Sequence, residues 1–335
     1  MKTCRTACLL ACLALGLTAQ AQGPNNTRTY YEWADGKTGE ALKSALSACI
    51  YNRTERSYGN LWTDFRSTDA RSDGKVWDMF SGVSNFTFGT DQDRGSGGKT
   101  EGEFYNREHS FPNSWFGSKT PPMYTDLHHV FPSDKLVNNK HSDNPLGEVG
   151  TPSWQSQGGF SKLGPARSGL GYGGTVFEPN DEYKGDFARA YFYMVTCYDE
   201  KIADWYVNYA DSRKMLDGKR YPGLAKWALT MLMRWAAQDP VSPKEQARNE
   251  AVYKIQKNRN PFIDYPGLEQ YVWGDRVGQP FHYDSYGTQA GVVGVTTATK
   301  ASGKPLYNLK GQPMQQGRKL RRGVYVRGKK KTLVK

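Results

Sequence analysis

Two segments in the second half of the chain are too apolar to lie on a protein surface. They run from Gly185 to Tyr198 and from Leu224 to Ala237, and both follow helical spacing. A helix that is apolar on most of its faces has to be buried. The chain is therefore expected to fold around at least two internal helices.

Weaker patterns predict two more helices. Apolar residues recur at helical spacing from Gly39 to Tyr51. Ser242 and Pro243 fit the N-cap and the first turn of a helix that reaches about Lys257. These patterns favour a helix-rich body.

Other stretches contain few apolar residues. Asp91 to Gly102 predicts a loop, and Gly150 to Asn180, dominated by Gly, Ser and Pro, predicts a long surface excursion without a core element. After Val277 the pattern changes to short β-prone runs, Gly291 to Thr297 and Val324 to Arg327. That change predicts a small β-rich appendage.

The first residues predict export. Lys2 and Arg5 precede a short apolar run, and Ala19-Gln20-Ala21 is typical of a signal-peptidase site. Removal of residues 1–21 would give a secreted or cell-surface protein, with the periplasm as the alternative. Lipid attachment at Cys12 is a weaker alternative, because its apolar region would be very short. No later run reaches the roughly 20 apolar residues that span a bilayer.

Cysteine usage and charge narrow the choices further. Export leaves only Cys49 and Cys197, which could form one disulfide or remain buried free thiols. The formal net charge is +12, but residues 300–335 contain twelve Lys or Arg and no acid. The rest of the chain is close to neutral, so overall charge is no evidence that the body binds nucleic acid.

Histidine is rare in this chain and is concentrated in one segment. Four of the five histidines lie between His109 and His141. Hydrolysis of a phosphodiester needs a base that deprotonates water, a divalent cation that neutralises phosphate charge, and help for the leaving oxygen. A pair of strands followed by a helix can supply these groups.

The sequence offers such a unit. Glu108 and His109 lie in a β-prone segment, where adjacent side chains point in different directions and suit different roles. Asp126 to Phe131 is expected to be the second strand. Pro132 is expected to begin a helix on which Asn138 faces back toward the hairpin.

These blocks resemble the endonuclease I family of periplasmic and secreted nucleases, in which a ββα-metal (His-Me finger) motif carries the active site. The resemblance extends from about Thr29 to Trp273. The matching motifs are Arg107-Glu108-His109, Asp126-Leu127-His128-His129-Val130-x-Pro132, Asn138, Trp77-Asp78-Met79-Phe80-Ser81, Gly185-Asp186-x-Ala188-Arg189-Ala190-x-Phe192-Tyr193-Met194 and Asn258-Arg259-Asn260-Pro261-Phe262.

The resemblance implies that His109 is the general base and that Glu108 and Asn138 hold a divalent cation. A neutral imidazole suits the first role near neutral pH. One carboxylate and one amide oxygen leave most of an octahedral shell to water and phosphate, which suits Mg²⁺, with other divalent cations as alternatives. Products with 5′-phosphate ends are expected.

Three arginines are candidates for contacts with the phosphate. They are Arg107, Arg189 and Arg259, although arginines in such positions are more often structural ion-pair partners. Asp126 is expected to cap or brace the hairpin. His129, where many relatives have Asn, is also expected to brace it.

Other interpretations of the motifs stay open. His128, His129 and His141 could form a zinc site, although their spacing fits no familiar zinc pattern. His141 could instead face phosphate or solvent. Trp115, Trp154 and Trp205 could stack on bases, but core packing is expected for most of the nine tryptophans.

The basic tail resembles the C-terminal sorting signal of type IX secretion. The matching segments are Tyr307 to Gln312, Gly323 to Val326 and Lys329 to Lys335. The resemblance implies contact with secretion machinery. An electrostatic arm that holds nucleic acid is the competing interpretation.

These patterns together predict an α+β catalytic domain over residues 22–276, with a ββα-metal core surrounded by helices, and a β-rich region over residues 277–335. The expected function is a monomeric, secreted endonuclease that cleaves DNA, and RNA as well, with little sequence specificity. The alternatives are a zinc-dependent hydrolase of another ester or a peptide, and a noncatalytic surface-binding protein.

Overall fold

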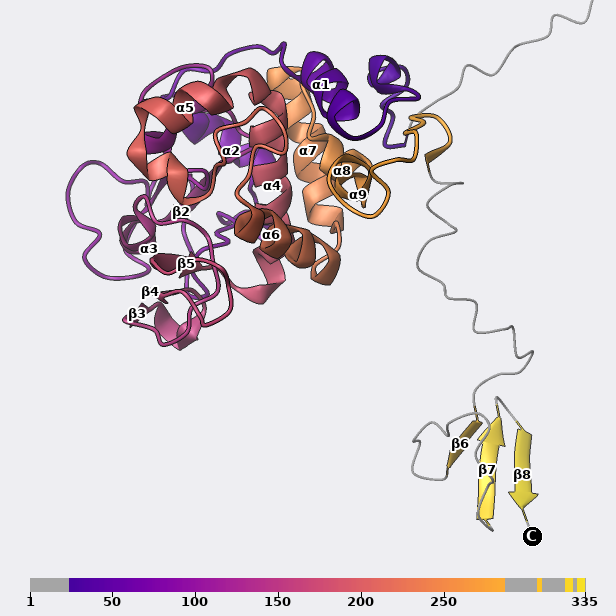
Figure 1. Ribbon diagram of the computed structural model, residues 1–335. Coiled ribbons are helices and arrows are strands. Elements are labelled where there is room, and N and C mark those ends of the chain that lie inside the picture. The colour runs from indigo at the N-terminus through magenta and orange to yellow at the C-terminus, as the bar shows by residue number, and fades with distance from the viewer. Residues whose placement is uncertain (1–23, 287–305, 309–322, 328–329, 335) are drawn as a thin grey trace, which may run out of the picture. The chain divides into compact units, whose positions relative to one another are not determined.

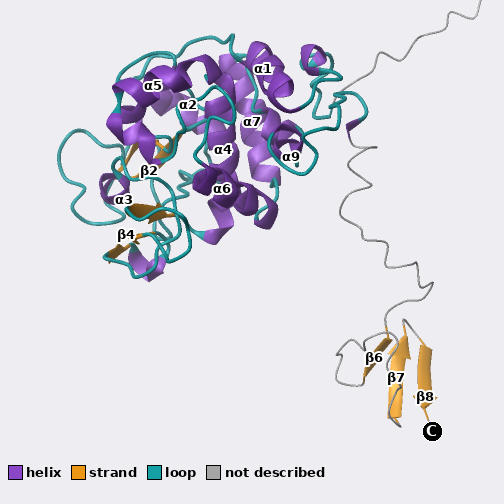
Figure 2. Ribbon diagram, viewed as in Figure 1, coloured by secondary structure: helices purple, strands orange, loops and turns teal. Residues whose placement is uncertain are grey.

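The computed structural model describes residues 24–286, 306–308, 323–327 and 330–334. The chain divides into two compact units, Met1–Gly287 and Thr288–Lys335. Within its described residues the first unit combines many helices with two small sheets, so its fold is α+β (Figures 1 and 2). The predicted signal peptide lies outside the described residues.

The helices surround a central helix, α4, which packs against α1, α6 and α8 (Figure 1). Their bounds are α1 (Gly39–Ile50), α2 (Leu61–Thr68), α3 (Lys135–His141), α4 (Lys184–Cys197), α5 (Ile202–Asn208), α6 (Lys226–Gln238), α7 (Pro243–Gln256), α8 (Pro261–Asp264) and α9 (Leu268–Val272).

Helix α4 is buried along nearly its whole length, as its apolar sequence predicts. Helix α6 is less enclosed, because it buries one face, including Met231 and Trp235, and leaves Lys226 and Thr230 exposed. Ser242 is the N-cap of α7, and its side chain takes part in a capping box with Glu245. That reciprocal pair satisfies two backbone N–H groups at the start of the helix.

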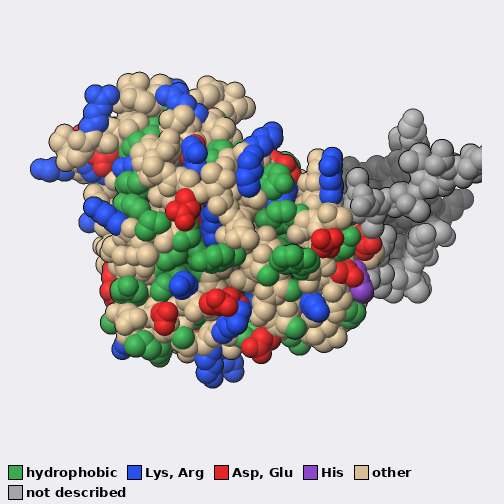
Figure 3. Space-filling view, turned by 90° about the horizontal axis from the view of Figure 1, so that it is seen from above, with side chains coloured by type: hydrophobic (Ala, Val, Ile, Leu, Met, Phe, Trp, Pro, Cys, Tyr) green, Lys and Arg blue, Asp and Glu red, His purple; other side chains and the backbone are tan. Residues whose placement is uncertain are grey.

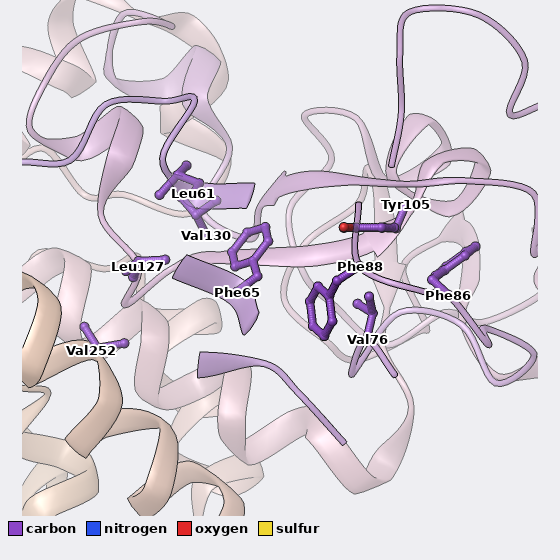
Figure 4. Packing of buried hydrophobic residues seen from close by; sticks show 9 residues of the cluster. All are labelled: Leu61, Phe65, Val76, Phe86, Phe88, Tyr105, Leu127, Val130 and Val252. Atoms are coloured by element: carbon purple, nitrogen blue, oxygen red, sulfur yellow. The ribbon is translucent and has the colours of Figure 1, made fainter. Parts of the chain in front are cut away.

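Strands β1 (Tyr105–His109) and β2 (Val130–Asp134) form an antiparallel pair that leads into α3. Tyr105 of β1 and Val130 of β2 pack in one buried cluster with side chains of α2 and α7 (Figure 4). The buried side chains of the cluster are Leu61, Phe65, Val76, Phe86, Phe88, Tyr105, Leu127, Val130 and Val252.

The second strand lies farther along the chain than the alternation predicts. Residues 126–129 form a turn rather than a strand, because the Asp126 carbonyl accepts hydrogen bonds from the N–H groups of His129 and Val130 at 3.2 and 3.1 Å. Pro132 lies inside β2 and does not begin a helix. Helix α3 begins after Asp134, whose carboxylate caps its first backbone N–H groups.

The Gly-rich segment predicted as a surface excursion forms a second sheet. Strands β3 (Trp154–Gln155), β4 (Lys162–Pro165) and β5 (Thr175–Glu178) pair antiparallel in that order. Val176 and Phe177 of β5 are fully buried. The prediction that this stretch has no core element is therefore wrong, since two apolar residues in a short strand are enough to anchor it.

The structure gives the state of the two remaining cysteines and the environment of three tryptophans. Cys49 and Cys197 are both free thiols. Trp115 and Trp205 are buried in the core, as expected, and Trp154 is half-buried on β3.

In the second unit, β6 (Leu306–Asn308), β7 (Gly323–Arg327) and β8 (Lys330–Val334) pair antiparallel in that order. Strand β7 contains the predicted run from Val324 to Arg327. The other predicted run, Gly291 to Thr297, lies outside the described residues. In the part of the chain that the structure describes, no helix is long and apolar enough to cross a membrane.

Asp126 is the buried centre of a hydrogen-bond network that joins the turn before β2 to three distant elements. Its carboxylate accepts hydrogen bonds from Arg53, from the hydroxyl groups of Tyr193 and Tyr198 at 2.7 and 2.8 Å, and from Gln256 at 3.0 Å. Burial opposes its ionisation, but Arg53 and the neighbouring histidines outweigh burial and hold its pKa well below the usual range.

Replacing Asp126 by Asn should therefore destabilise the fold strongly. The change leaves the buried Arg53 guanidinium without its counter-charge, and breaking a buried ion pair in this way costs about 3 to 5 kcal/mol of unfolding free energy. Chemical denaturation measures that difference. Asp73→Asn, which breaks an exposed pair with Arg71, is the control and should leave the unfolding free energy almost unchanged, because water already screens such a pair. Equal effects of the two changes would contradict the prediction.

Candidate active site

The C-terminal half of β1 and one face of α3 line a pocket of about 480 Å³. Glu108, His109 and Asn138, which were predicted to converge, all line this pocket. The lining is mainly polar. It consists of Tyr58, Asn106, Arg107, Glu108, His109, Pro112, Asn113, Ser114, Asn138, Asn139, Ser142 and Asp143.

His109 ends β1 and is held by one hydrogen bond and two aromatic rings. Its Nε2–H donates to the Tyr124 carbonyl oxygen at 2.9 Å, and its ring stacks with Tyr124 and Tyr58 at centroid distances of 5.0 and 6.1 Å. Since Nε2 carries the proton in this hydrogen bond, the lone pair of the neutral ring lies on Nδ1. Burial lowers the pKa of His109 to about 3, so the ring is neutral at pH 7.

Glu108 precedes His109 and is tied to α3. Its carboxylate accepts a hydrogen bond from Nδ1 of His141, which is fully buried beside the Phe177 ring. Burial raises the pKa of Glu108, and His141 opposes that rise. His141 therefore faces neither phosphate nor solvent. Its other nitrogen, Nε2, is buried and has no hydrogen-bond partner among the described residues.

Asn138 lies three positions before His141 and so on the same face of α3. Its Nδ2–H donates to the Arg107 carbonyl oxygen at 3.5 Å. Helix α3 thus presents one side chain to the pocket and another to the carboxylate of Glu108. The helix and β1 are linked at both positions.

The donor groups of the pocket fit a hard divalent cation better than zinc. One carboxylate and one carboxamide supply oxygen ligands of the kind that Mg²⁺ prefers, with space for water and phosphate. Within residues 24–286 and the three short strands of the second unit, no three His, Cys, Asp or Glu side chains form a cluster that could hold a metal ion.

Arg107 lies at the edge of the pocket with its guanidinium between two aromatic rings. Its central carbon lies 3.5 Å from the Tyr58 ring centroid and 4.1 Å from that of Trp62. One nitrogen donates to the Tyr58 carbonyl oxygen at 2.8 Å. No salt bridge found among the described residues includes Arg107.

The other two candidate arginines do not line the pocket. Arg189 donates to both oxygens of Glu245 at 2.5 and 2.7 Å, and Arg259 donates to both oxygens of Asp264 at 2.7 and 2.8 Å. Both arginines are only 2% exposed. The structure therefore places them in buried ion pairs that join helices.

His128 and His129 also lie outside the pocket. Nε2–H of His128 donates a hydrogen bond to the Asn258 carbonyl oxygen at 3.2 Å. Nε2–H of His129 donates one to the Met123 carbonyl oxygen at 2.7 Å. Burial lowers the pKa of both rings to about 4, so both are neutral at pH 7. These histidines and His141 make separate contacts, so the structure does not assemble the zinc site of the alternative interpretation.

Sequence reasoning did not find Tyr58, Trp62 and Tyr124. The first two lie in the segment around the start of α2, almost fifty positions before β1, and no local motif marks them. Tyr124 precedes the second motif and acts through its backbone carbonyl, which every residue type carries. Stacking of these rings on Arg107 and His109 becomes visible only in three dimensions.

One face of the molecule shows no large patch of basic side chains. On the face seen in Figure 3, Lys and Arg side chains are scattered among acidic and apolar ones and do not gather in one large patch. This distribution agrees with a body of near-zero net charge.

Comparison with known proteins places the chain in a family. Residues 38–267 match the family model described as Endonuclease I. The chain is 34% identical over 265 residues to the extracellular ribonuclease of Bacillus subtilis (strain 168), covering 77% of this chain and 83% of that protein. It is also 34% identical over 253 residues to the extracellular ribonuclease of Bacillus amyloliquefaciens, covering 74% and 79%.

The fold and pocket thus belong to a nuclease that hydrolyses phosphodiester bonds. The chain is a member of the endonuclease I family, because the family model covers more than half of its length.

The neutral, buried state of His129 predicts a specific pH dependence of stability. Its pKa of about 4 in the folded state lies below the value of about 6.5 in the unfolded chain. Its contribution to stability is therefore complete above pH 6.5 and is lost as the pH falls toward 4, at about 1.4 kcal/mol per pH unit.

The His129→Asn variant lacks the titrating imidazole. The amide that replaces it can still donate a hydrogen bond to the Met123 carbonyl oxygen. The loss of unfolding free energy between pH 7 and pH 5 should be smaller in the variant than in the wild type by about 2 kcal/mol. Denaturant titrations of both proteins at the two pH values measure it. An identical pH dependence would mean that His129 is protonated in the folded protein.

Proposed function

We propose that this protein is a secreted, metal-dependent endonuclease that cleaves DNA and RNA with little sequence specificity and leaves 5′-phosphate ends. The names of the two Bacillus relatives support secretion and action on RNA. Low sequence specificity is expected because the pocket offers groups suited to phosphate and metal, and phosphate contacts carry no sequence information.

The observation that carries the proposal is the convergence of Glu108, His109 and Asn138 on one polar pocket. The three residues come from β1 and α3, two elements that β2 joins. We propose that this unit is the ββα-metal core of the enzyme. Glu108 and Asn138 would hold the cation, which when bound neutralises charge on the phosphate and on the leaving oxygen.

His109 is the general base in this proposal. Its Nδ1 lone pair is available at neutral pH, because Nε2–H is engaged by the Tyr124 carbonyl oxygen. Nδ1 accepts a proton from the attacking water, and the carbonyl oxygen stabilises the imidazolium that forms. The negative charge of the phosphate raises the basicity of the ring further. Stacking on Tyr124 and Tyr58 keeps the ring plane fixed during the transfer.

Arg107 binds the phosphate in this scheme. A guanidinium that rests between two rings and has no carboxylate partner keeps its charge for a ligand. In contrast, Arg189 and Arg259 keep their buried partners and stabilise the helical scaffold. His141, a positioning residue, fixes the carboxylate of Glu108 through its Nδ1–H.

Replacing His109 by Ala should lower kcat on plasmid DNA and on RNA by about 10² to 10⁴ fold, the usual contribution of general-base catalysis. Gel assays with Mg²⁺ measure the loss, and EDTA should abolish wild-type activity. Calorimetric titration with Mn²⁺ should show that the variant still binds the cation. Activity above a tenth of the wild-type value in the variant would contradict the assigned base.

Replacing His141 by Phe should raise the Mg²⁺ concentration at half-maximal activity by about 10 to 100 fold, the usual effect of losing a hydrogen bond to a metal-binding carboxylate. Saturating Mg²⁺ should restore most of kcat, and titration with Mn²⁺ should show the same weakening without substrate. His128→Phe, which alters a buried histidine that does not contact Glu108, is the matched control. An unchanged Mg²⁺ dependence in His141→Phe would contradict the positioning role.

A further inference from the structure

A second pocket, outside the candidate active site, has a volume of about 390 Å³. It lies where the 3-10 turn η1 (Glu32–Ala34) packs against the C-terminal part of α1 and faces the end of α4. Its volume falls in the range of small-molecule sites. Its lining consists of Trp33, Ser44, Ser47, Ala48, Tyr51, Asn52, Cys197, Tyr198, Asp199, Glu200, Lys201 and Arg220.

This pocket gathers the exposed aromatic side chains of the described residues. Among the described residues, five large hydrophobic side chains are exposed. Two of these five are aromatic, Trp33 at 65% and Tyr51 at 44% exposure. Both line this pocket. Exposed aromatic side chains that gather at one pocket can mark a ligand-binding site, whereas single scattered ones carry no such information. Indole and phenol rings are side chains on which nucleic-acid bases stack.

The charges of this pocket are balanced within the protein. Asp199, only 2% exposed, accepts hydrogen bonds from Ser47 at 3.1 Å and from Arg220 at 2.7 Å. Arg220 also pairs with Glu200 at 3.5 Å. The lining thus contains two acids, Asp199 and Glu200, and two bases, Lys201 and Arg220. Because these charges balance, the pocket suits an uncharged, flat group and not a phosphate.

A short stretch of chain links this pocket to the active site. Tyr51 lines the first pocket and Tyr58 lines the second. Seven residues of backbone cover at most about 25 Å. At the rise of 3.4 Å per nucleotide of a stacked strand, about seven nucleotides cover the same distance, and an extended strand needs fewer.

We propose that Trp33 and Tyr51 form a base-stacking subsite for single-stranded nucleic acid whose scissile phosphate lies in the His109 pocket. This proposal rests on the proposed function. A base of the same strand, several nucleotides from the cleaved bond, stacks on the two rings, and Asn52 and Ser44 can offer polar groups to its edge. The subsite strengthens binding of long substrates and leaves the chemical step unchanged.

The kinetic test compares a single-stranded 12-mer with a dinucleotide, each in DNA and RNA form. Trp33→Ala should raise KM for the 12-mer by about five- to tenfold, the usual loss of one base stack, and leave kcat and all dinucleotide kinetics unchanged. Tyr51→Ala should act in the same direction, and Trp33→Phe should restore most of the affinity. Val207→Ala, which shortens an equally exposed apolar side chain outside both pockets, is the control.

Salt dependence separates stacking from charge. Because stacking releases no counterions, the ratio of KM between Trp33→Ala and wild type should be the same at 50 and 200 mM NaCl. Unchanged KM for the 12-mer in both alanine variants would overturn the proposal. A ratio that falls toward one as salt rises would also overturn it, because the pocket would then act through charge.

A binding measurement keeps this proposal distinct from the proposed function. In EDTA, and with the His109→Ala variant as the host, the 12-mer should quench tryptophan fluorescence, and Trp33→Phe in the same host should lose most of the quenching. Quenching by the 12-mer together with absent cleavage in the wild type would refute the nuclease assignment and keep the subsite. Cleavage by the wild type together with equal quenching in His109→Ala and in His109→Ala combined with Trp33→Phe would refute the subsite and keep the nuclease assignment.

Discussion

The pairing of β1 with β2 is the interaction on which the candidate site depends. Opposite His109 lies Val130, and opposite Glu108 lies Phe131, so the strand pair buries its apolar side against α2 and α7 while the end of β1 opens into the pocket. A slip of one residue would turn every side chain of β1 to the opposite face. The buried cluster shown in Figure 4 therefore fixes which side chains face the pocket.

The candidate site combines one neutral, buried histidine, His109, with an arginine, Arg107, that forms no salt bridge within the described residues. Burial keeps His109 unprotonated, and the aromatic rings around it and Arg107 exclude water without neutralising charge. Several other arginines are paired with acids in the interior, among them Arg53 and Arg248. The paired arginines join elements of the scaffold. Arg107, which is in no salt bridge within the described residues, lies beside the pocket.

The sequence allowed prediction of three side chains that meet in the candidate site and of the apolar helices, because both depend on residue type and local spacing. Glu108, His109 and Asn138 meet in one pocket, and α1, α4 and α7 lie close to their expected limits. The position of β2 was not predictable from alternation, since hydrogen bonds to the Asp126 carbonyl turn the chain before the strand begins.

Contacts between distant segments were also beyond the reach of local patterns. The bond between His141 and Glu108, the stacking of Tyr58 on Arg107 and the burial of Phe177 each join residues far apart in the chain. Such contacts depend on how the elements pack, and one sequence carries no record of which residues meet. They nevertheless determine the orientation of the predicted groups.

The most direct test of the central claim is a crystal structure of the His109→Ala variant soaked with Mn²⁺ and a short oligonucleotide, with the metal located by its anomalous signal. One metal peak is expected at bonding distance from an oxygen of Glu108 and the side-chain oxygen of Asn138, with a phosphate oxygen on the same ion. A metal bound at His128 or His129, or a phosphate bound away from this pocket, would contradict it.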